Sequence, residues 1–339
     1  MYSLNCLKFS RTFQCLNRII SRNACTKNSY SIERLSKRTL LSLSGKDTKN
    51  YLQSMMTNDI KNLDVLPSLY ALLLNSKGSV IYDIILYKLE ENEYVVEYDA
   101  TGVEYLQTHM LMYRLRKDVK IQPLNSLTAW VIHNKMGEDA NCDEHNEMVQ
   151  QISKLNGVIS CVKDPRIKDL GIRVITEKNI DLQTILPADI KHEMGDSYRL
   201  LRYKLGIGEG VLDHPPGECH PFDINVDLLN GVSFSKGCYI GQEMVARSHN
   251  VFVIRKRLMP VVLREMDSYP AFPPECTIVN EKAKTLGRFR NNLGKYGLAL
   301  LKYEDCEKSN IIKFKDFDIS LEVKRPHWWP ANLKSENTQ

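Results

Sequence analysis

The chain of 339 residues contains nine cysteines, but no two of them have the C-x-x-C spacing. They stand at positions 6, 15, 25, 142, 161, 219, 238, 276 and 306. Zinc ribbons, thioredoxin-type redox motifs and ferredoxin-type cluster cages rely on that spacing, so the sequence argues against all three. If iron–sulfur chemistry is involved, its ligands must include residues from other chains or residues scattered along this one.

Long apolar runs are also missing. The longest unbroken runs, such as Tyr70–Leu74, fall far short of the roughly 20 residues that a membrane-spanning helix needs. There is no Walker loop and no G-x-G-x-x-G fingerprint, so the sequence gives no support for nucleotide phosphate binding. We therefore predict no membrane span and no nucleotide site.

Acidic residues are absent from residues 1–32, which hold five basic side chains together with several serines and leucines. This basic, hydroxylated and amphipathic composition is typical of a mitochondrial transit peptide, with cleavage expected between residues 22 and 35. Removing those five cations from the 46 basic residues leaves 41, equal to the 41 acidic residues. A neutral body gives no electrostatic case for nucleic-acid binding.

The length favours two or three domains with alternating helices and strands. Ser44–Asp47 resembles a capping box and predicts a helix that contains Tyr51 and Met55. Further on we expect strands at 69–74, 80–89, 93–98, 129–133, 158–162 and 171–175, and helices at 102–116, 144–155, 179–186 and 196–205. From about residue 259, short apolar runs separated by Gly and Pro predict a small β-barrel with strands at 259–263, 277–279, 298–301, 311–314 and 319–323. A strand is also expected from Phe252 to Val262.

Residues 206–221 have the composition of an ordered loop, with four glycines and three prolines. His214, Cys219 and His220 fall in this segment, but their spacing matches no metal motif. We expect an exposed irregular loop there rather than a metal site.

Residues 231–247 hold the most informative stretch. Gly231–Phe234 alternates as a strand does, Ser-Lys-Gly supplies a turn, and a short helix can begin near Gly241. Cys238 would then lie at a strand-to-helix elbow beside Lys236, where a cation and free backbone N–H groups favour thiolate over thiol. The alternative is a tight turn in which Cys238 is only a small buried apolar residue.

Lys236-Gly237-Cys238-Tyr239-Ile240-Gly241-Gln242-Glu243-Met244-Val245-Ala246-Arg247 resembles the K-G-C-[YF]-x-G-Q-E-x-x-A-R signature of the YgfZ-type family. This family is the iron–sulfur assembly branch of the folate-binding aminomethyltransferase (glycine-cleavage T-protein) superfamily. The resemblance extends over roughly residues 38–330. It includes Asn75–Asp83, Arg202-Tyr203, Pro215–Gly217, Val253–Leu258 and His327–Pro330.

The resemblance implies an α+β fold. Two interleaved α/β sections (36–258, with a boundary near 125) and a C-terminal β-barrel (259–330) would surround a central folate-sized hole. Two positions depart from the superfamily pattern. Tyr82-Asp83 stands where aminomethyltransferases carry an Asp-Asp pair, and Lys204 replaces a pterin-binding Glu near Arg202. An ammonium offers only donors, so tetrahydrofolate binding through Arg202 and Lys204 is chemically weakened.

The resemblance and the leader together imply a mitochondrial matrix factor. It would act late in cluster assembly with an A-type iron–sulfur carrier and mature apo [4Fe–4S] client proteins. Cys238 would be a cluster ligand shared transiently with the partner, because thiolate is the ligand that such clusters prefer. The motif residues Lys236, Gly237, Tyr239, Gly241, Gln242, Glu243 and Arg247 would shape this site, with Glu243 and Arg247 pairing and both glycines purely structural.

Two alternatives stay open. The chain could be a tetrahydrofolate-dependent one-carbon transferase with Asp83 as proton acceptor. It could also be a redox enzyme that uses Cys238 and a distant resolving cysteine.

Overall fold

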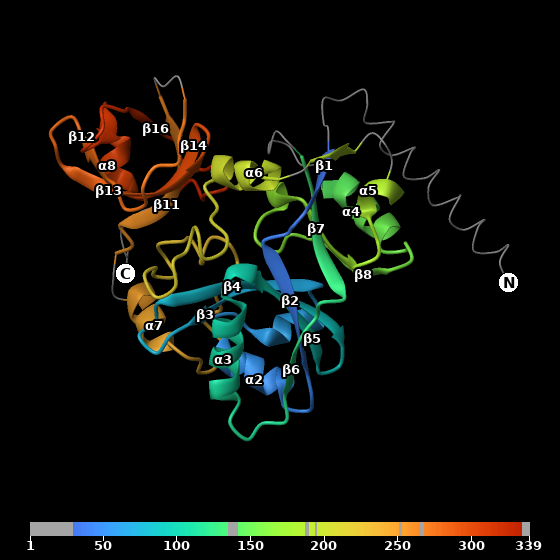
Figure 1. The fold of residues 1–339 in the computed structure, drawn as a ribbon. Coiled ribbons are helices and arrows are strands. Elements are labelled where there is room, and N and C mark those ends of the chain that lie inside the picture. Colours follow the sequence, from blue (N-terminus) through green and yellow to red (C-terminus); the bar gives the residue numbers. More distant parts are fainter. Residues whose placement is uncertain are drawn as a thin grey trace.

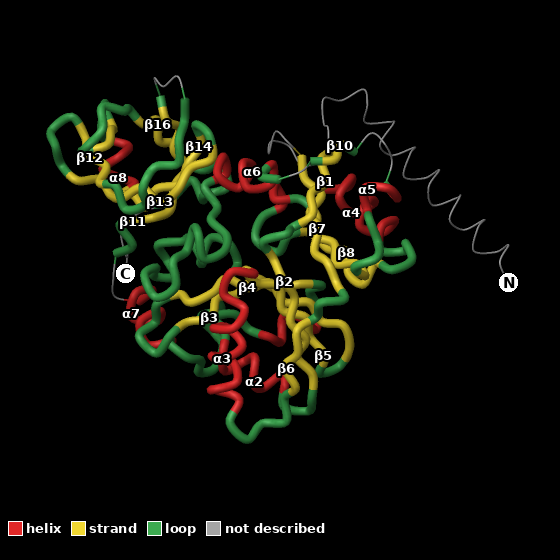
Figure 2. The backbone as a smooth tube through the Cα atoms, in the orientation of Figure 1, coloured by secondary structure: helices red, strands yellow, loops and turns green. Residues whose placement is uncertain are grey.

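The structure is a computed structural model that describes residues 30–134, 142–186, 190–193, 195–250, 253–264 and 268–333. Three sheets organise these residues, and Figure 1 shows them as three bodies around a central run of coil that includes residues 206–235. The loops that fill the space between the sheets are green in Figure 2. No helix among these residues is both long enough and apolar enough to cross a bilayer.

The first sheet has the strand order β3-β4-β5-β2-β6. Its strands are β2 (Arg38–Ser44), β3 (Ser68–Leu74), β4 (Val80–Glu90), β5 (Glu93–Asp99) and β6 (Lys120–Pro123). It carries helices α2 (Thr48–Met55) and α3 (Val103–Arg114) and the 3₁₀ turns η1 (Ile60–Asp64) and η2 (Ala100–Gly102). The predicted strands at 69–74, 80–89 and 93–98 and the turn between the first two are confirmed.

Both faces of this sheet are covered. In β3, Leu69, Ala71 and Leu73 pack against the helices α2 and α3, whereas Tyr70 and Leu72 belong to a core shared with the second sheet. Successive side chains of a strand point to opposite faces, so two apolar faces produce the continuous run Leu69–Leu74 rather than an alternating one.

The second sheet has the order β10-β1-β7-β9-β8. Its strands are β1 (Tyr30–Arg34), β7 (Leu127–Asn134), β8 (Val158–Lys163), β9 (Ile172–Glu177) and β10 (Lys191–His192), accompanied by α4 (Cys142–Ile152), η3 (Lys168–Leu170) and α5 (Leu182–Ile185). The strand that comes first in the chain, β1, lies between β10 and β7, so the two α/β sections are interleaved as expected.

The position of β1 corrects the predicted start of the folded body. Tyr30 and Ile32 were assigned to the transit peptide, but both are buried in β1. Ile32 is paired with Ile132 of β7 and His192 of β10. The folded body therefore includes residues 30–35, and residues 1–29 of the predicted leader lie outside the described part of the chain.

Helix α6 (Ser197–Leu205) links the second sheet to the barrel at the top of Figure 1. It ends as predicted at Gly206, which adopts the left-handed conformation with φ 76°. Its N-terminus is capped by Glu33, a residue far away in the sequence. The Glu33 carboxylate accepts from the backbone N–H of Tyr198 at 2.9 Å and from the hydroxyl of Ser197 at 2.6 Å. Asp196, the predicted cap, makes no side-chain capping bond.

The third sheet is a nearly closed barrel with the order β15-β12-β13-β14-β11-β16. Its strands are β11 (Lys256–Leu263), β12 (Thr277–Asn280), β13 (Thr285–Leu293), β14 (Tyr296–Lys302), β15 (Ile312–Phe314) and β16 (Leu321–Val323), with helix α8 (Tyr303–Glu307). The five short strands predicted here are confirmed. β13 was missed because Gly287, Arg288 and Arg290 interrupt its apolar pattern, and the strand predicted from Phe252 begins only at Lys256.

Three local predictions were wrong. Asp47 makes no capping bond, because its carboxylate accepts from Asp118 N at 2.8 Å instead. Gly231–Phe234 is irregular rather than a strand, because its backbone groups bond to Thr57. The Thr57 hydroxyl donates to Gly231 O, and Ser233 N donates to Thr57 O. The loop at 206–221 is irregular but not exposed throughout: His214 and Cys219 are buried, and only His220 of the three is exposed.

Candidate functional site

Lys236 holds the Cys238 loop (residues 231–241) on the N-terminal side of Cys238. The Lys236 ammonium donates to the carbonyl oxygens of Gln53 at 2.8 Å, Met56 at 2.6 Å and Asn58 at 2.6 Å. These carbonyls lie at and just beyond the C-terminus of α2, where a cation is favoured by the helix dipole. Burial lowers the pKa of Lys236 to about 8, which leaves the ammonium form in place at neutral pH. Lys236 thus anchors the loop to α2.

On the C-terminal side of Cys238, the loop is held through the backbone N–H groups of Tyr239 and Ile240. Ile240 N donates to Ser54 O at 3.1 Å, and the Gln242 side chain accepts from Tyr239 N at 3.2 Å. Gly241 has φ 79°, and a Cβ there would lie 2.6 Å from Asn75 O. Gly241 therefore needs to be glycine for both conformation and space, as its predicted structural role requires.

Cys238 lies between these two anchors and is exposed. The other cysteines with described side chains are less accessible: Cys161, Cys219 and Cys306 are buried, and Cys276 is partly exposed with Sγ 3.1 Å from Pro273 O. Burial raises the pKa of Cys161 and Cys306 to about 12 and that of Cys219 to about 11, so these thiols stay protonated and unreactive. Cys142 lies at the edge of an undescribed segment.

The helical half of the predicted elbow is confirmed as α7 (Gln242–Asn250). Glu243 lies in its first turn and Arg247 in its last, the arrangement that the helix dipole favours. Both side chains are exposed, and the described part of the chain shows no ion pair between them, so the predicted Glu243–Arg247 pair is absent.

An aromatic stack borders the loop. Phe234 is 49% exposed and lies between Phe222 and His249, with ring centroids 6.3 Å and 3.7 Å away. Beside it, a groove of about 330 Å³ is lined by Phe222, Met244 and Val253 together with His220 and Arg255. The groove and the exposed ring thus lie on the same side of the loop as Phe222.

Asp83, the predicted proton acceptor, is only 1% exposed and both of its oxygens are occupied. Oδ1 accepts from Gly210 N at 2.8 Å and Oδ2 from Arg38 at 3.1 Å. Burial alone would raise its pKa, but the Arg38 guanidinium and His214 outweigh that effect and lower it. A buried, saturated carboxylate with a lowered pKa is a poor general base.

Asp83 belongs to an ionic core of nine buried charged residues at the junction of the first two sheets, which the sequence did not reveal. Its members are Arg38, Asp83, Glu97, Asp164, Arg166, Arg173, Arg202, Glu209 and Asp213. Arg173 from β9 pairs with Glu97 from β5, with Asp164 and with Glu209, so one guanidinium ties both sheets to the central coil.

The residues predicted to contact folate do not converge on one cavity. Arg202 is buried and pairs with Asp213 at 2.9 Å, whereas Lys204 is exposed and places its ammonium 5.2 Å from the Tyr296 ring on the barrel. A cavity of about 1010 Å³ is lined by neither of them and not by Asp83. Arg202 and Lys204 therefore do not form a shared folate site in the described part of the chain.

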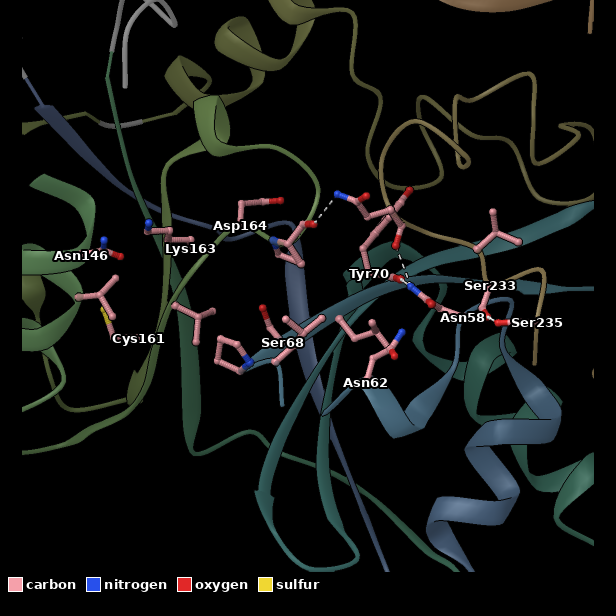
Figure 3. Close-up of a pocket in the computed structure, with 18 of the residues that line it drawn as sticks. Asn58, Asn62, Ser68, Tyr70, Asn146, Cys161, Lys163, Asp164, Ser233 and Ser235 are labelled. Atoms are coloured by element: carbon pink, nitrogen blue, oxygen red, sulfur yellow. Dashed lines mark hydrogen bonds between the residues drawn. The ribbon is translucent and has the colours of Figure 1, made fainter. Parts of the chain in front are cut away.

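That cavity lies between the edge strands β3 and β8, as Figure 3 shows. Tyr70 and Ser68 come from the first sheet, Cys161 and Lys163 from the second, and Ser233 from the Cys238 loop. Cys238 does not line it. The Cys238 loop thus contributes Ser233 to the cavity wall, whereas its exposed thiol is not part of that wall.

Comparisons with known proteins agree with this architecture. The chain matches the family models of the GCVT N-terminal domain over residues 9–133 and of the CAF17 C-terminal beta-barrel domain over residues 255–331. The crystal structure of the glycine cleavage system aminomethyltransferase T from Bartonella henselae superposes with a TM-score of 0.68 at 13% identity, covering 92% of this chain and 89% of that one. This likeness confirms the expected α+β fold.

Curated relatives are more similar in sequence. The iron–sulfur cluster assembly factor IBA57, mitochondrial, of Homo sapiens is 34% identical over 320 residues, covering 89% of this chain and 86% of the relative. The protein of the same name from Mus musculus is 32% identical over 341 residues, covering 94% and 92%. The chain therefore belongs to the family of mitochondrial iron–sulfur cluster assembly factors that includes these two proteins.

Proposed function

We propose that this chain is a mitochondrial matrix protein that acts late in iron–sulfur cluster assembly, binding an A-type carrier and maturing apo [4Fe–4S] proteins. The observation that carries the proposal is the exposed Cys238 on a loop anchored on both sides by Lys236 and Ile240. A fixed and accessible thiol is what the exchange of a soft metal ligand requires.

One thiolate cannot hold a cluster by itself. Among the residues that the structure describes, no group of three or more His, Cys, Asp or Glu side chains is placed to hold a metal ion. The carrier must therefore supply the remaining ligands, and the cluster is cargo that the two proteins share. In the exchange, the Cys238 sulfur bonds to iron as one carrier thiolate leaves, and the Cys238 proton passes to that leaving thiolate. No electrons are transferred.

The one-carbon transferase is the weaker candidate. It needs Asp83 as a free base beside a folate pocket, but Asp83 is bound to Arg38 and Gly210 inside the ionic core. The redox alternative needs a resolving cysteine, and of the cysteines whose side chains the structure describes, those other than Cys238 and Cys276 are buried.

The test is anaerobic cluster reconstitution of the mature chain with an A-type carrier, following visible absorbance and complex size. Cys238→Ser is compared with wild type, and Cys276→Ser is the matched control because, of the thiols that the structure describes, Cys276 is the one that is partly accessible. We expect a cluster-bearing complex with wild type and Cys276→Ser and none with Cys238→Ser. Equal cluster-bearing complexes from all three proteins would refute the proposal.

A further inference from the structure

Gly237, next to Cys238, is the feature that the fold itself does not explain. Among the sixteen glycines that the structure describes, the other fifteen either have a positive φ or would place a Cβ within 3 Å of another atom. Gly237 shows neither property: its φ lies outside the left-handed region, and a Cβ there would meet nothing within 4 Å. This corrects the expectation that both motif glycines are structural.

Flexibility does not explain Gly237 either. Ser233 N is bonded to Thr57 O at 3.0 Å, Lys236 holds three carbonyls, and Ile240 N is bonded to Ser54 O. The loop is thus fixed immediately before and shortly after Gly237. Glycine in a fixed loop costs conformational entropy on folding, so alanine would serve the isolated chain better.

The backbone N–H groups at Gly237 and Cys238 are also available to a ligand. The N–H groups of Gly237 and Cys238 have no acceptor among the residues that the structure describes. They belong to the exposed Cys238 and to the residue directly before it. Backbone N–H groups next to a metal-bound sulfur commonly donate to the sulfur atoms of a cluster and tune its potential.

We infer that Gly237 keeps the approach to Cys238 open, so that a metal–sulfide cluster held by a partner's thiolates reaches the Cys238 sulfur. The inference rests on the proposed function and deepens it. A cluster is bulkier than a thiol reagent, because it arrives with its own ligands and the chain that bears them. A methyl group at position 237 would occupy open space next to Cys238, since a Cβ there meets no atom within 4 Å, and it would narrow the room left for this cargo.

The experiment compares wild type with Gly237→Ala, using Ser235→Ala as a control in the same exposed segment. Three quantities are measured: the Tm, the rate at which iodoacetamide alkylates Cys238, and the rate of cluster exchange with the loaded A-type carrier. We expect Gly237→Ala to keep the Tm or raise it by about 1–2 °C. Alkylation by the small reagent should stay within twofold of wild type, and cluster exchange should slow at least tenfold. Ser235→Ala should match wild type in all three.

The outcomes separate this inference from the proposed function. If Cys238→Ser abolishes cluster exchange while Gly237→Ala exchanges at the wild-type rate, the role of Gly237 is refuted and the proposed function stands. If Cys238→Ser also exchanges normally, both fail. A Tm lowered by several degrees, or alkylation slowed as much as exchange, would show that alanine distorts the loop, which also overturns the inference.

Discussion

Gly78 and Gly241 meet through their backbones, and a Cβ on residue 241 would lie 3.0 Å from the Cα of Gly78. Gly78 belongs to the turn between β3 and β4, and its own Cβ would lie 2.5 Å from that of Met244 in α7. The Cys238 loop and α7 therefore pack directly against the turn of the β3–β4 hairpin. No larger residue fits at either position without moving one element away from the other.

Gly241→Ala should destabilise the protein by about 2–4 kcal/mol. The left-handed backbone conformation is strained for alanine, and its Cβ would clash with Asn75 O. Gly217→Ala is the control, since Gly217 has φ 83° but its Cβ would lie 4.0 Å from the nearest atom. It should cost only about 1 kcal/mol. Chemical denaturation measures both, and equal losses would show that the contact with the hairpin is unimportant.

Lys236→Met should remove the anchor on α2. Three carbonyl oxygens lose their donor, so we expect a loss of about 2–4 kcal/mol and faster proteolysis within residues 231–241. The alternative role for Lys236 is to activate the Cys238 thiol. In that case the variant would unfold at the wild-type denaturant concentration but be alkylated more slowly, so the two measurements together decide between anchor and activator.

Asp83→Asn should act on stability rather than on chemistry. It breaks the buried pair with Arg38, which we expect to cost about 3 kcal/mol. Cluster exchange per folded molecule, measured below the lowered Tm, should equal wild type. Asp305→Asn is the control, because the exposed Lys284–Asp305 pair should contribute less than about 1 kcal/mol. Loss of exchange in fully folded Asp83→Asn would restore a catalytic role for this carboxylate.

Acid should weaken the ionic core through Asp164. Burial alone would raise its pKa, but Arg166 and Arg173 outweigh it and lower the pKa from 3.8 to about 2. A carboxylate with a lowered folded-state pKa stabilises the native state above its unfolded value and loses that contribution as the pH falls from about 4 to 2. The shift corresponds to about 2 kcal/mol.

Unfolding titrations of wild type and Asp164→Asn at pH 7, 4 and 3 measure this contribution. The stability difference between the two proteins should be largest at pH 7 and shrink toward pH 3. A difference that is independent of pH over this range would mean that the ionised form of Asp164 does not stabilise the fold.

The sequence predicted the elements whose signals are local. The hairpin of β3 and β4 has an apolar run on each side of Asn75–Gly78, and α6 stops at Gly206 because its left-handed conformation suits glycine. The motif around Cys238 gave the family and the helix α7. In each case the residues that determine the structure lie within a few positions of one another.

Features that depend on distant residues were missed. Nothing near Lys236 reveals that its acceptors are the carbonyls of residues 53–58, and Glu33 caps a helix that begins more than 160 positions later. The ionic core joins Glu97 to Arg173 across two sheets, and such charged residues read as ordinary surface residues in a sequence. Ser233 is bonded to Thr57 instead of a neighbouring strand, which explains the strand predicted in error.

The placement of β1 has a consequence for how the chain folds. Ile32 pairs with Ile132 and with His192, so the pairing of β1 with β7 and β10 closes loops of about 100 and 160 residues. Loop closure of this length carries its entropy cost before the strands gain any contacts, which slows folding. A fragment that begins near residue 125 would look like a complete α/β unit in sequence but would lack the strand that lies between β10 and β7. The second section is thus a domain in space without being an independent folding unit, and its assembly must wait for residues far apart in the chain.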